Sequence, residues 1–157
     1  MKYTRLTKEQ LDALQPEFIN FLASQTITAE EWKKIKKEQP HIAEDELDVF
    51  SDLVWEGALT KATYLENISK SQLYLFHLDI EAMHVFLIKI KNEEVDLLTK
   101  EGFYWLEKNI TDDDKIDILT ASKEYSGDKN LDKFQLIQQG AFISKGEKYK
   151  SIKKLFS

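Results

Sequence analysis

The stretch LYLFHLDIEAMHVFLIKI, residues 73–90, decides the fold class of this chain. Its two apolar runs, 73–78 and 83–90, are rich in aromatic and β-branched residues, which favour strands. The short link at 79–82 suits two antiparallel neighbours, so the stretch predicts a hairpin. A helix that begins at Asp79 is the alternative that the pattern leaves open.

Upstream of residue 70 the apolar positions follow the 3.6-residue period of helices. Thr7 and Gln10 have the spacing of a capping box, in which each residue satisfies the other's backbone amide, and Thr28 and Glu31 repeat it. Pro16 either kinks the first helix or opens a second one, because proline has no amide hydrogen to donate in a helix interior. The first half therefore predicts helices.

Pro40 begins a further helix, which we expect to end at Gly57, a natural C-cap residue. A short helix is expected at 60–67. The remaining expected elements are a short strand at 95–98, a helix capped by Thr99, a strand at 116–120, a helix at 131–139, an extended piece at 141–143 and a basic helix after Gly146.

Length and composition fit one domain of 157 residues, since 42% of the chain is hydrophobic and can fill a core. We predict an α+β fold with a helical part at 1–69 and an α+β part at 70–157 that includes the basic C-terminal helix. The helical part is expected to pack on a small mixed or antiparallel sheet.

Charge and residue types limit the possible functions. The net charge is −6, yet the last 29 residues carry seven lysines against Asp132 and Glu147 and are basic. The acidic remainder would repel nucleic acid. The absence of cysteine excludes disulfides, thiolate metal sites and cysteine nucleophiles. The apolar stretch 84–90 is far shorter than the roughly 20 residues of a membrane span, and no secretory signal is visible, so we expect a cytoplasmic protein that does not enter membranes.

Several segments together resemble a family of uncharacterised small proteins from Bacteroidota. They are FSDLVWEG at 50–57, LFH at 75–77, TASK at 120–123 and DKNL at 128–131, and the similarity extends to the opening MKYTRL. The resemblance implies a bacterial cytoplasmic protein. It brings no activity, fold, partner or site residue with it.

His77, Glu81 and His84 are the candidate metal ligands, because imidazole and carboxylate groups bind zinc, manganese or iron. On a hairpin the two histidines could face each other. On a helix they would lie about 10 Å apart along the axis, too far to share an ion. The spacing matches no recognised metal motif, so we favour histidines that are half-buried beside the strands, and we expect no metal and no cofactor.

Tyr125, Ser126 and Lys129 have the spacing of two catalytic motifs, Tyr-x-x-x-Lys and Ser-x-x-Lys. Both motifs need a context that this sequence lacks, above all a glycine-rich turn that could hold a dinucleotide. Ser126-Gly127-Asp128 is ordinary turn chemistry, and we interpret the segment as a turn.

Lysines next to aromatic residues form two basic patches, which could bind phosphates and bases. The aromatic and aliphatic residues among them, including Tyr149, Ile152 and Phe156, recur at helical spacing and should face the core, which disfavours nucleic-acid binding. The lysines of the two patches are Lys33, Lys34, Lys36 and Lys37, and Lys145, Lys148, Lys150, Lys153 and Lys154.

These observations favour a non-enzymatic cytoplasmic protein-interaction module whose partner is unknown and could be another protein. Trp55, if exposed at the end of the acidic helix, would anchor a partner, as would the C-terminal lysines. The alternative, which we favour for Trp55, is that it packs between the helical and α+β parts. A metal-dependent hydrolase that uses the segment from His77 to His84 is the second hypothesis. An RNA-binding protein that uses the C-terminal lysines is the third. No catalytic residue is assigned.

Overall fold

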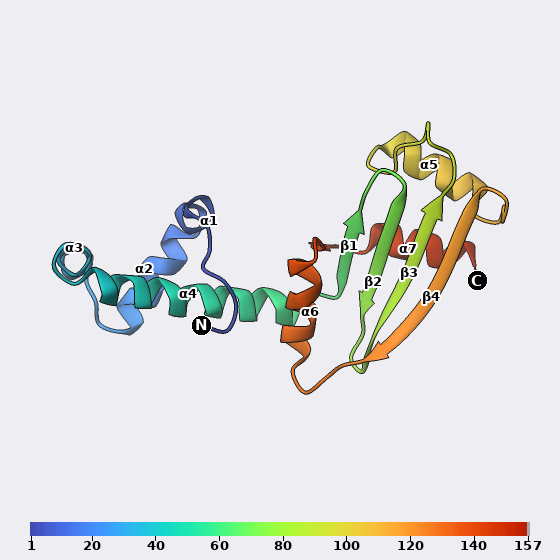
Figure 1. Ribbon diagram of the computed structural model, residues 1–157. Helices are drawn as coiled ribbons and strands as arrows, with labels where there is room; N and C mark the ends of the chain where they lie inside the picture. Colours follow the sequence, from blue (N-terminus) through green and yellow to red (C-terminus); the bar gives the residue numbers. More distant parts are fainter. Residues whose placement is uncertain (157) are drawn as a thin grey trace. The chain divides into compact units, whose positions relative to one another are not determined.

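The structure, a computed structural model, describes residues 1–156, within which seven helices and a five-stranded sheet are present (Figure 1). These elements confirm the predicted α+β fold. The chain divides into two compact units, Met1–Thr60 (the helical unit) and Lys61–Ser157 (the sheet unit). In the described residues, no helix combines the length and the apolar character that a membrane crossing requires.

The helical unit begins as its capping signals predict. Thr7 caps α1 (Lys8–Ala13) in a complete capping box, and Thr28 caps α3 (Ala29–Glu38) by accepting from the Glu31 amide. Pro16 lies in the first turn of α2 (Gln15–Ser24), so it opens a second helix and does not kink the first. The rings of Phe18, Phe21, Trp32 and Phe50 pack against one another in the core of this unit.

Two predictions around residue 60 are wrong. Helix α4 (Pro40–Lys61) continues past Gly57, so Gly57 does not end it, and residues 60–67 do not form a separate helix. Instead, β1 (Tyr64–Ile68) follows α4 and pairs with one strand on each side, so strand pairing satisfies its backbone groups. Tertiary pairing here overrides a local pattern that suits a helix.

The predicted hairpin is confirmed, because β2 (Gln72–Leu78) and β3 (Ala82–Ile90) pair antiparallel around a short turn. The strand predicted at 116–120 is the start of β4 (Ile116–Glu124), and the extended piece near 142 is β5 (Phe142–Ser144). The strand order is β4-β3-β2-β1-β5, with every neighbouring pair antiparallel. The strand expected at 95–98 is absent; residues 97 and 98 lie in a turn, and residues 95 and 96 have no regular secondary structure.

Helices cover the two faces of the sheet unequally. Leu106 of α5 (Lys100–Asn109) and Ile152 of α7 (Glu147–Leu155) join the fully buried Leu73, Leu75 and Ile88 in the main core. We call this side of the sheet the core face. On the opposite face, Leu136 and Ile137 of α6 (Lys129–Gln138) pack against a smaller cluster that includes Leu65, Leu78 and Met83. Figure 1 shows α7 crossing behind β2 and β3.

Candidate functional site

A row of polar and aromatic side chains crosses the core face at the end of the sheet next to the β2–β3 turn. The strand register brings Tyr64 opposite both Ser144 and His77, His77 opposite His84, and His84 opposite Ser122. Because residues directly opposite one another in antiparallel strands point to the same face, these side chains are neighbours. The two histidines that the hairpin alternative predicts to face each other do so, with ring centroids 5.9 Å apart.

His77 lies among aromatic rings. It stacks on Tyr64, with centroids 4.8 Å apart and planes 13° apart, and lies 5.4 Å from the ring of Tyr149 in α7. Burial lowers the pKa of the His77 imidazole below its ordinary value, the carboxylate of Asp79 opposes this effect, and the charges of His84, Lys150 and Lys153 add to it. These surroundings favour a neutral imidazole held by stacking.

His84 has polar neighbours on both ring nitrogens. Its Nδ1 lies 2.6 Å from the hydroxyl oxygen of Ser122, and its Nε2 lies 3.9 Å from a carboxylate oxygen of Asp79. A serine hydroxyl that shares a hydrogen bond with an imidazole, itself near a carboxylate, has the connectivity of an activated nucleophile. This arrangement can move a proton between Ser122 and His84.

The three candidate metal ligands are not brought together. Glu81 is exposed in the turn between the strands, and the carboxylate near His84 belongs to Asp79. Within residues 1–156, no group of three or more histidine and carboxylate side chains is placed to hold a metal ion.

The C-terminal lysines surround a helix whose apolar side faces the core. Tyr149 and Ile152 are buried as expected, whereas Phe156 is 49% exposed, contrary to the prediction, although its ring lies 6.1 Å from that of Phe86. The helix ends at Leu155, so Phe156 has left its inward face. Lys148 lies over the ring of Phe103 and Lys150 over that of Tyr64, at 5.4 and 5.0 Å. Lys145, Lys153 and Lys154 are also exposed at this end of the chain.

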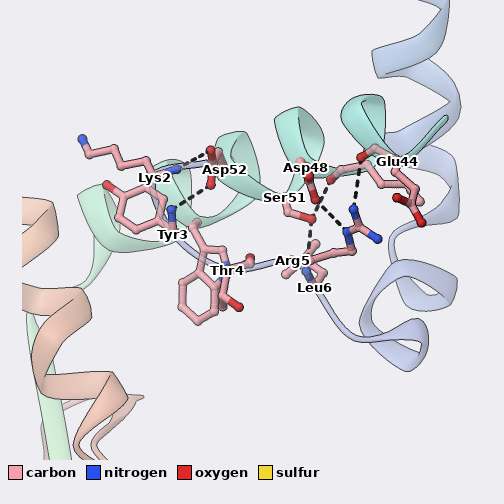
Figure 2. Close-up of polar contacts among 11 residues, drawn as sticks. Lys2, Tyr3, Thr4, Arg5, Leu6, Glu44, Asp48, Ser51 and Asp52 are labelled. Atoms are coloured by element: carbon pink, nitrogen blue, oxygen red, sulfur yellow. Dashed lines mark hydrogen bonds and ion pairs between the residues drawn. The ribbon is translucent and has the colours of Figure 1, made fainter. Parts of the chain in front are cut away.

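Trp55 is half-buried in the helical unit, where its indole nitrogen donates to the Thr4 carbonyl oxygen at 3.0 Å. This contact belongs to a larger set that fastens residues 2–6, the N-terminal strap, along α4 (Figure 2). The carboxylate of Asp52 accepts from the backbone amides of Lys2 and Tyr3, at 2.8 and 2.9 Å. Trp55 thus has a role in holding the strap.

The next contacts of the strap run toward the start of α4. Arg5 donates to Asp48 at 2.7 Å, and the Leu6 amide donates to the hydroxyl of Ser51 at 3.0 Å (Figure 2). The guanidinium of Arg5 lowers the pKa of the Asp48 carboxyl. Together with Asp52 and Trp55, these α4 residues recur at the three- and four-residue spacing of one helix face. Part of the acidic face of α4 is therefore a binding surface for the chain's own N-terminal segment.

The motif at 125–129 is a turn, as interpreted. The amide and hydroxyl of Ser126 both donate to the carboxylate of Asp132, and Asp128 caps α6 by accepting from the Leu131 amide. Lys129 donates to the Ile80 carbonyl oxygen, and Tyr125 to that of Asp79. These contacts fasten the turn to the β2–β3 link.

The face of the sheet opposite the core carries an apolar surface in addition to the site residues predicted from the sequence. Leu78 and Met83 form a row under α6 next to the β2–β3 turn. Further from that turn, on the same face, two more apolar rows cross β2, β3 and β4. The side chains on β2 and β3 are half-buried and those on β4 are exposed. We call these six residues the open block: Tyr74, Phe76, Val85, Leu87, Leu119 and Ala121.

A signal for this surface exists in the sequence. The runs 73–78 and 83–90 are apolar at nearly every position, whereas a strand with one solvent-facing side alternates. Such a run requires cover on both faces of the sheet. The helices of the sheet unit cover the core face more completely than they cover the opposite face.

Between the open block and α6 lies a hollow of about 390 Å³. Phe76, Val85 and Leu136 give it apolar walls, and Lys123 and Asp132 add one charge of each sign. Gln135 and Gln139 of the α6 region also line it. The arrangement can accept an apolar group with polar atoms at its edge.

Comparison with known proteins gives the family. The model of a family described as "Family of unknown function (DUF6495)" matches residues 1–157, so the chain belongs to that family. This confirms the coarser part of the expected resemblance, membership of a family without an assigned function. No curated protein and no solved structure matches the chain.

Proposed function

We propose that this member of a family of unknown function is a non-enzymatic protein-interaction module, which binds an apolar segment of a partner protein at the open block. The observation that carries the proposal is the pair of apolar rows whose side chains are half-buried on β2 and β3 and exposed on β4, next to a hollow of about 390 Å³. Contiguous apolar surface of this kind marks interaction sites on folded proteins.

The chemistry of the surface defines the partner. The rings of Tyr74 and Phe76 stack at a centroid distance of 6.2 Å and give the block a flat aromatic side, and aromatic residues are enriched in protein interfaces. Lys123 and Asp132 beside the hollow suit a segment that carries polar backbone or side-chain groups next to its apolar side chains. We therefore expect a peptide segment or loop of another protein.

Site-specific photo-crosslinking tests the proposal. A photoreactive phenylalanine analogue at Gln135, which lines the hollow, should give a discrete protein adduct in native lysate. The same analogue at Gln138, exposed on the same helix but not lining the hollow, is the matched control.

A third preparation combines the analogue at Gln135 with Gln139→Trp, which places a large side chain at the hollow, and should lose the adduct. Identical adducts from both positions, or an adduct that persists after Gln139→Trp, would show that the hollow is not the binding site.

Hydrolysis is a second candidate function, favoured by the 2.6 Å contact between Ser122 and His84 with Asp79 nearby. Turnover of an activated ester, abolished by both Ser122→Ala and His84→Gln in folded protein, would support it. Equal rates in the wild type and Ser122→Ala would remove Ser122 as a nucleophile.

A further inference from the structure

The two edges of the sheet differ in how many backbone groups they offer for pairing with another strand. One edge is β5, with three residues, and the other is β4, with nine. Very short edge strands offer few unpaired backbone groups, whereas a long edge strand is a ready template for pairing. Residues 119–124 of β4 are all exposed.

The free edge of β4 has its hydrogen-bonding groups in regular order. The Lys91 amide donates to the Lys115 carbonyl oxygen, which makes this pair a hydrogen-bonded one in the β3–β4 ladder. Because hydrogen-bonded and non-hydrogen-bonded pairs alternate in antiparallel sheets, the odd-numbered residues of β4 bond to β3. The even-numbered residues from Ile118 to Glu124 therefore direct their N–H and C=O groups to the free edge, whereas the Ile116 amide donates to the Asp112 carbonyl oxygen.

Two common devices that protect an edge strand, proline and a β-bulge, are missing from β4. It contains no proline, and its register against β3 runs without a bulge over all nine pairs from Ile116 to Glu124. On the face opposite the core it presents Leu119, which is 65% exposed, and Ala121. An exposed edge of this length with apolar side chains is a pairing site.

We infer that two copies of the chain associate through antiparallel pairing of their β4 strands, with Thr120 opposite Thr120 on the two-fold axis. In this register Asp117 of each copy faces Lys123 of the other, and Leu119 faces Ala121. A two-fold axis repeats each contact, so the interface holds two ion pairs and two apolar pairs. Thr120 is the middle residue of β4, so the full strand is paired.

Shifting the two-fold axis by one residue in either direction brings less favourable residue pairs opposite each other. Centring the axis on Leu119 places Lys115 opposite Lys123, a like-charge pair on each side of the axis. Centring it on Ala121 places Leu119 opposite Lys123. Like charges directly opposite each other destabilise paired strands, whereas opposite charges and apolar pairs stabilise them. The register with Thr120 on the two-fold axis therefore pairs opposite charges and also places the whole length of β4 opposite the second copy.

A charge exchange tests the inference. By sedimentation equilibrium, we expect a dimer for the wild type, and a roughly tenfold or larger rise in Kd for both Asp117→Lys and Lys123→Asp, because each change puts two like-charge pairs into the interface. The double variant Asp117→Lys with Lys123→Asp restores opposite charges at both places and should regain the dimer.

Controls separate this from general charge effects and from the proposed function. Asp45→Lys and Lys33→Asp, at exposed positions of the helical unit, make the same charge changes outside the sequence of β4 and should leave the Kd unchanged. A monomeric wild type, or a double variant as weak as the single ones, would overturn the inference. The inference does not rest on partner binding at the hollow, because Asp117 does not line the hollow and loss of the dimer in Asp117→Lys therefore reports on strand pairing alone.

Discussion

In the helical unit, polar side chains along α4 bind the chain's own N-terminal strap, whereas in the described residues of the sheet unit two apolar rows of the sheet face are only partly covered. Asp52 receives two backbone amides and Trp55 reaches a carbonyl oxygen of the strap. The open block has no such polar contacts with α6; of its residues, Phe76 packs against the cluster of Leu65, Leu78 and Met83 under that helix.

This contrast shows that charge pattern alone does not locate a binding surface. The acidic face of α4 suggests a binding site for a basic partner, yet Asp48 and Asp52 accept hydrogen bonds from the strap within the same unit. The apolar run of the hairpin predicts ordinary core, yet half of it lies on a face that is only partly covered. The two surfaces that we propose for binding, the open block and the β4 edge, are therefore both in the sheet unit.

The largest effect should come from the covered face of the sheet. Ile88→Ala removes a fully buried side chain and should lower the free energy of unfolding by about 2–5 kcal/mol, since it leaves a cavity in the main core. Leu119→Ala on the open block should change it by about 0.5 kcal/mol or less. Urea denaturation in dilute solution measures both, and equal losses would contradict the inequality of the two faces.

The strap should give an intermediate effect. Asp52→Ala removes the acceptor of two backbone amides, with a charged partner in both bonds, and should destabilise the helical unit by about 1–2 kcal/mol. Hydrogen exchange of residues 2–6 should rise at the same time. Asp45→Ala, another acidic residue of α4 that is exposed, is the control. Unchanged exchange in Asp52→Ala would show that the strap is held by other contacts.

Elements with a local signal could be predicted from the sequence. The capping residues Thr7, Thr28 and Thr99 each accept a hydrogen bond from the amide three residues later, because this chemistry is complete within one turn. The hairpin followed from two apolar runs and a short link. The hollow could not be predicted, because it depends on how α6 lies against strands that are distant in the chain.

The wrong predictions at 60–67 and 95–98 have one physical origin. Residues 60–67 and 95–98 have local patterns that suit a helix and a strand, and tertiary contacts decide otherwise. In the second case Leu97 is buried and its amide bonds to the Lys70 carbonyl oxygen, so a single contact satisfies it without a strand. The histidine pair was found because sequence proximity and pairing register agree, whereas Ser122, 38 residues away from His84, carried no signal.

The smallest effect concerns the covered face again and depends on pH. Because burial lowers the pKa of His77 below its ordinary value, the unfolded chain takes up a proton at a higher pH than the folded protein does. The stabilising contribution is complete above pH 6.5, the ordinary value, and is lost as the pH falls through 6.5 toward the lower folded value. Asp79 reduces this loss, while His84, Lys150 and Lys153 increase it.

His77→Phe keeps an aromatic ring next to Tyr64 and removes the titrating group, so the free energy of unfolding should fall less between pH 7 and pH 5 than in the wild type. Urea titrations at several pH values measure this difference, with His41→Phe in the helical unit as the control. A larger loss on acidification in His77→Phe would mean that the folded protein binds the proton more tightly than the unfolded chain. The attraction of Asp79 would then outweigh burial, and this end of the sheet would be a charged site and no longer part of the covered apolar face.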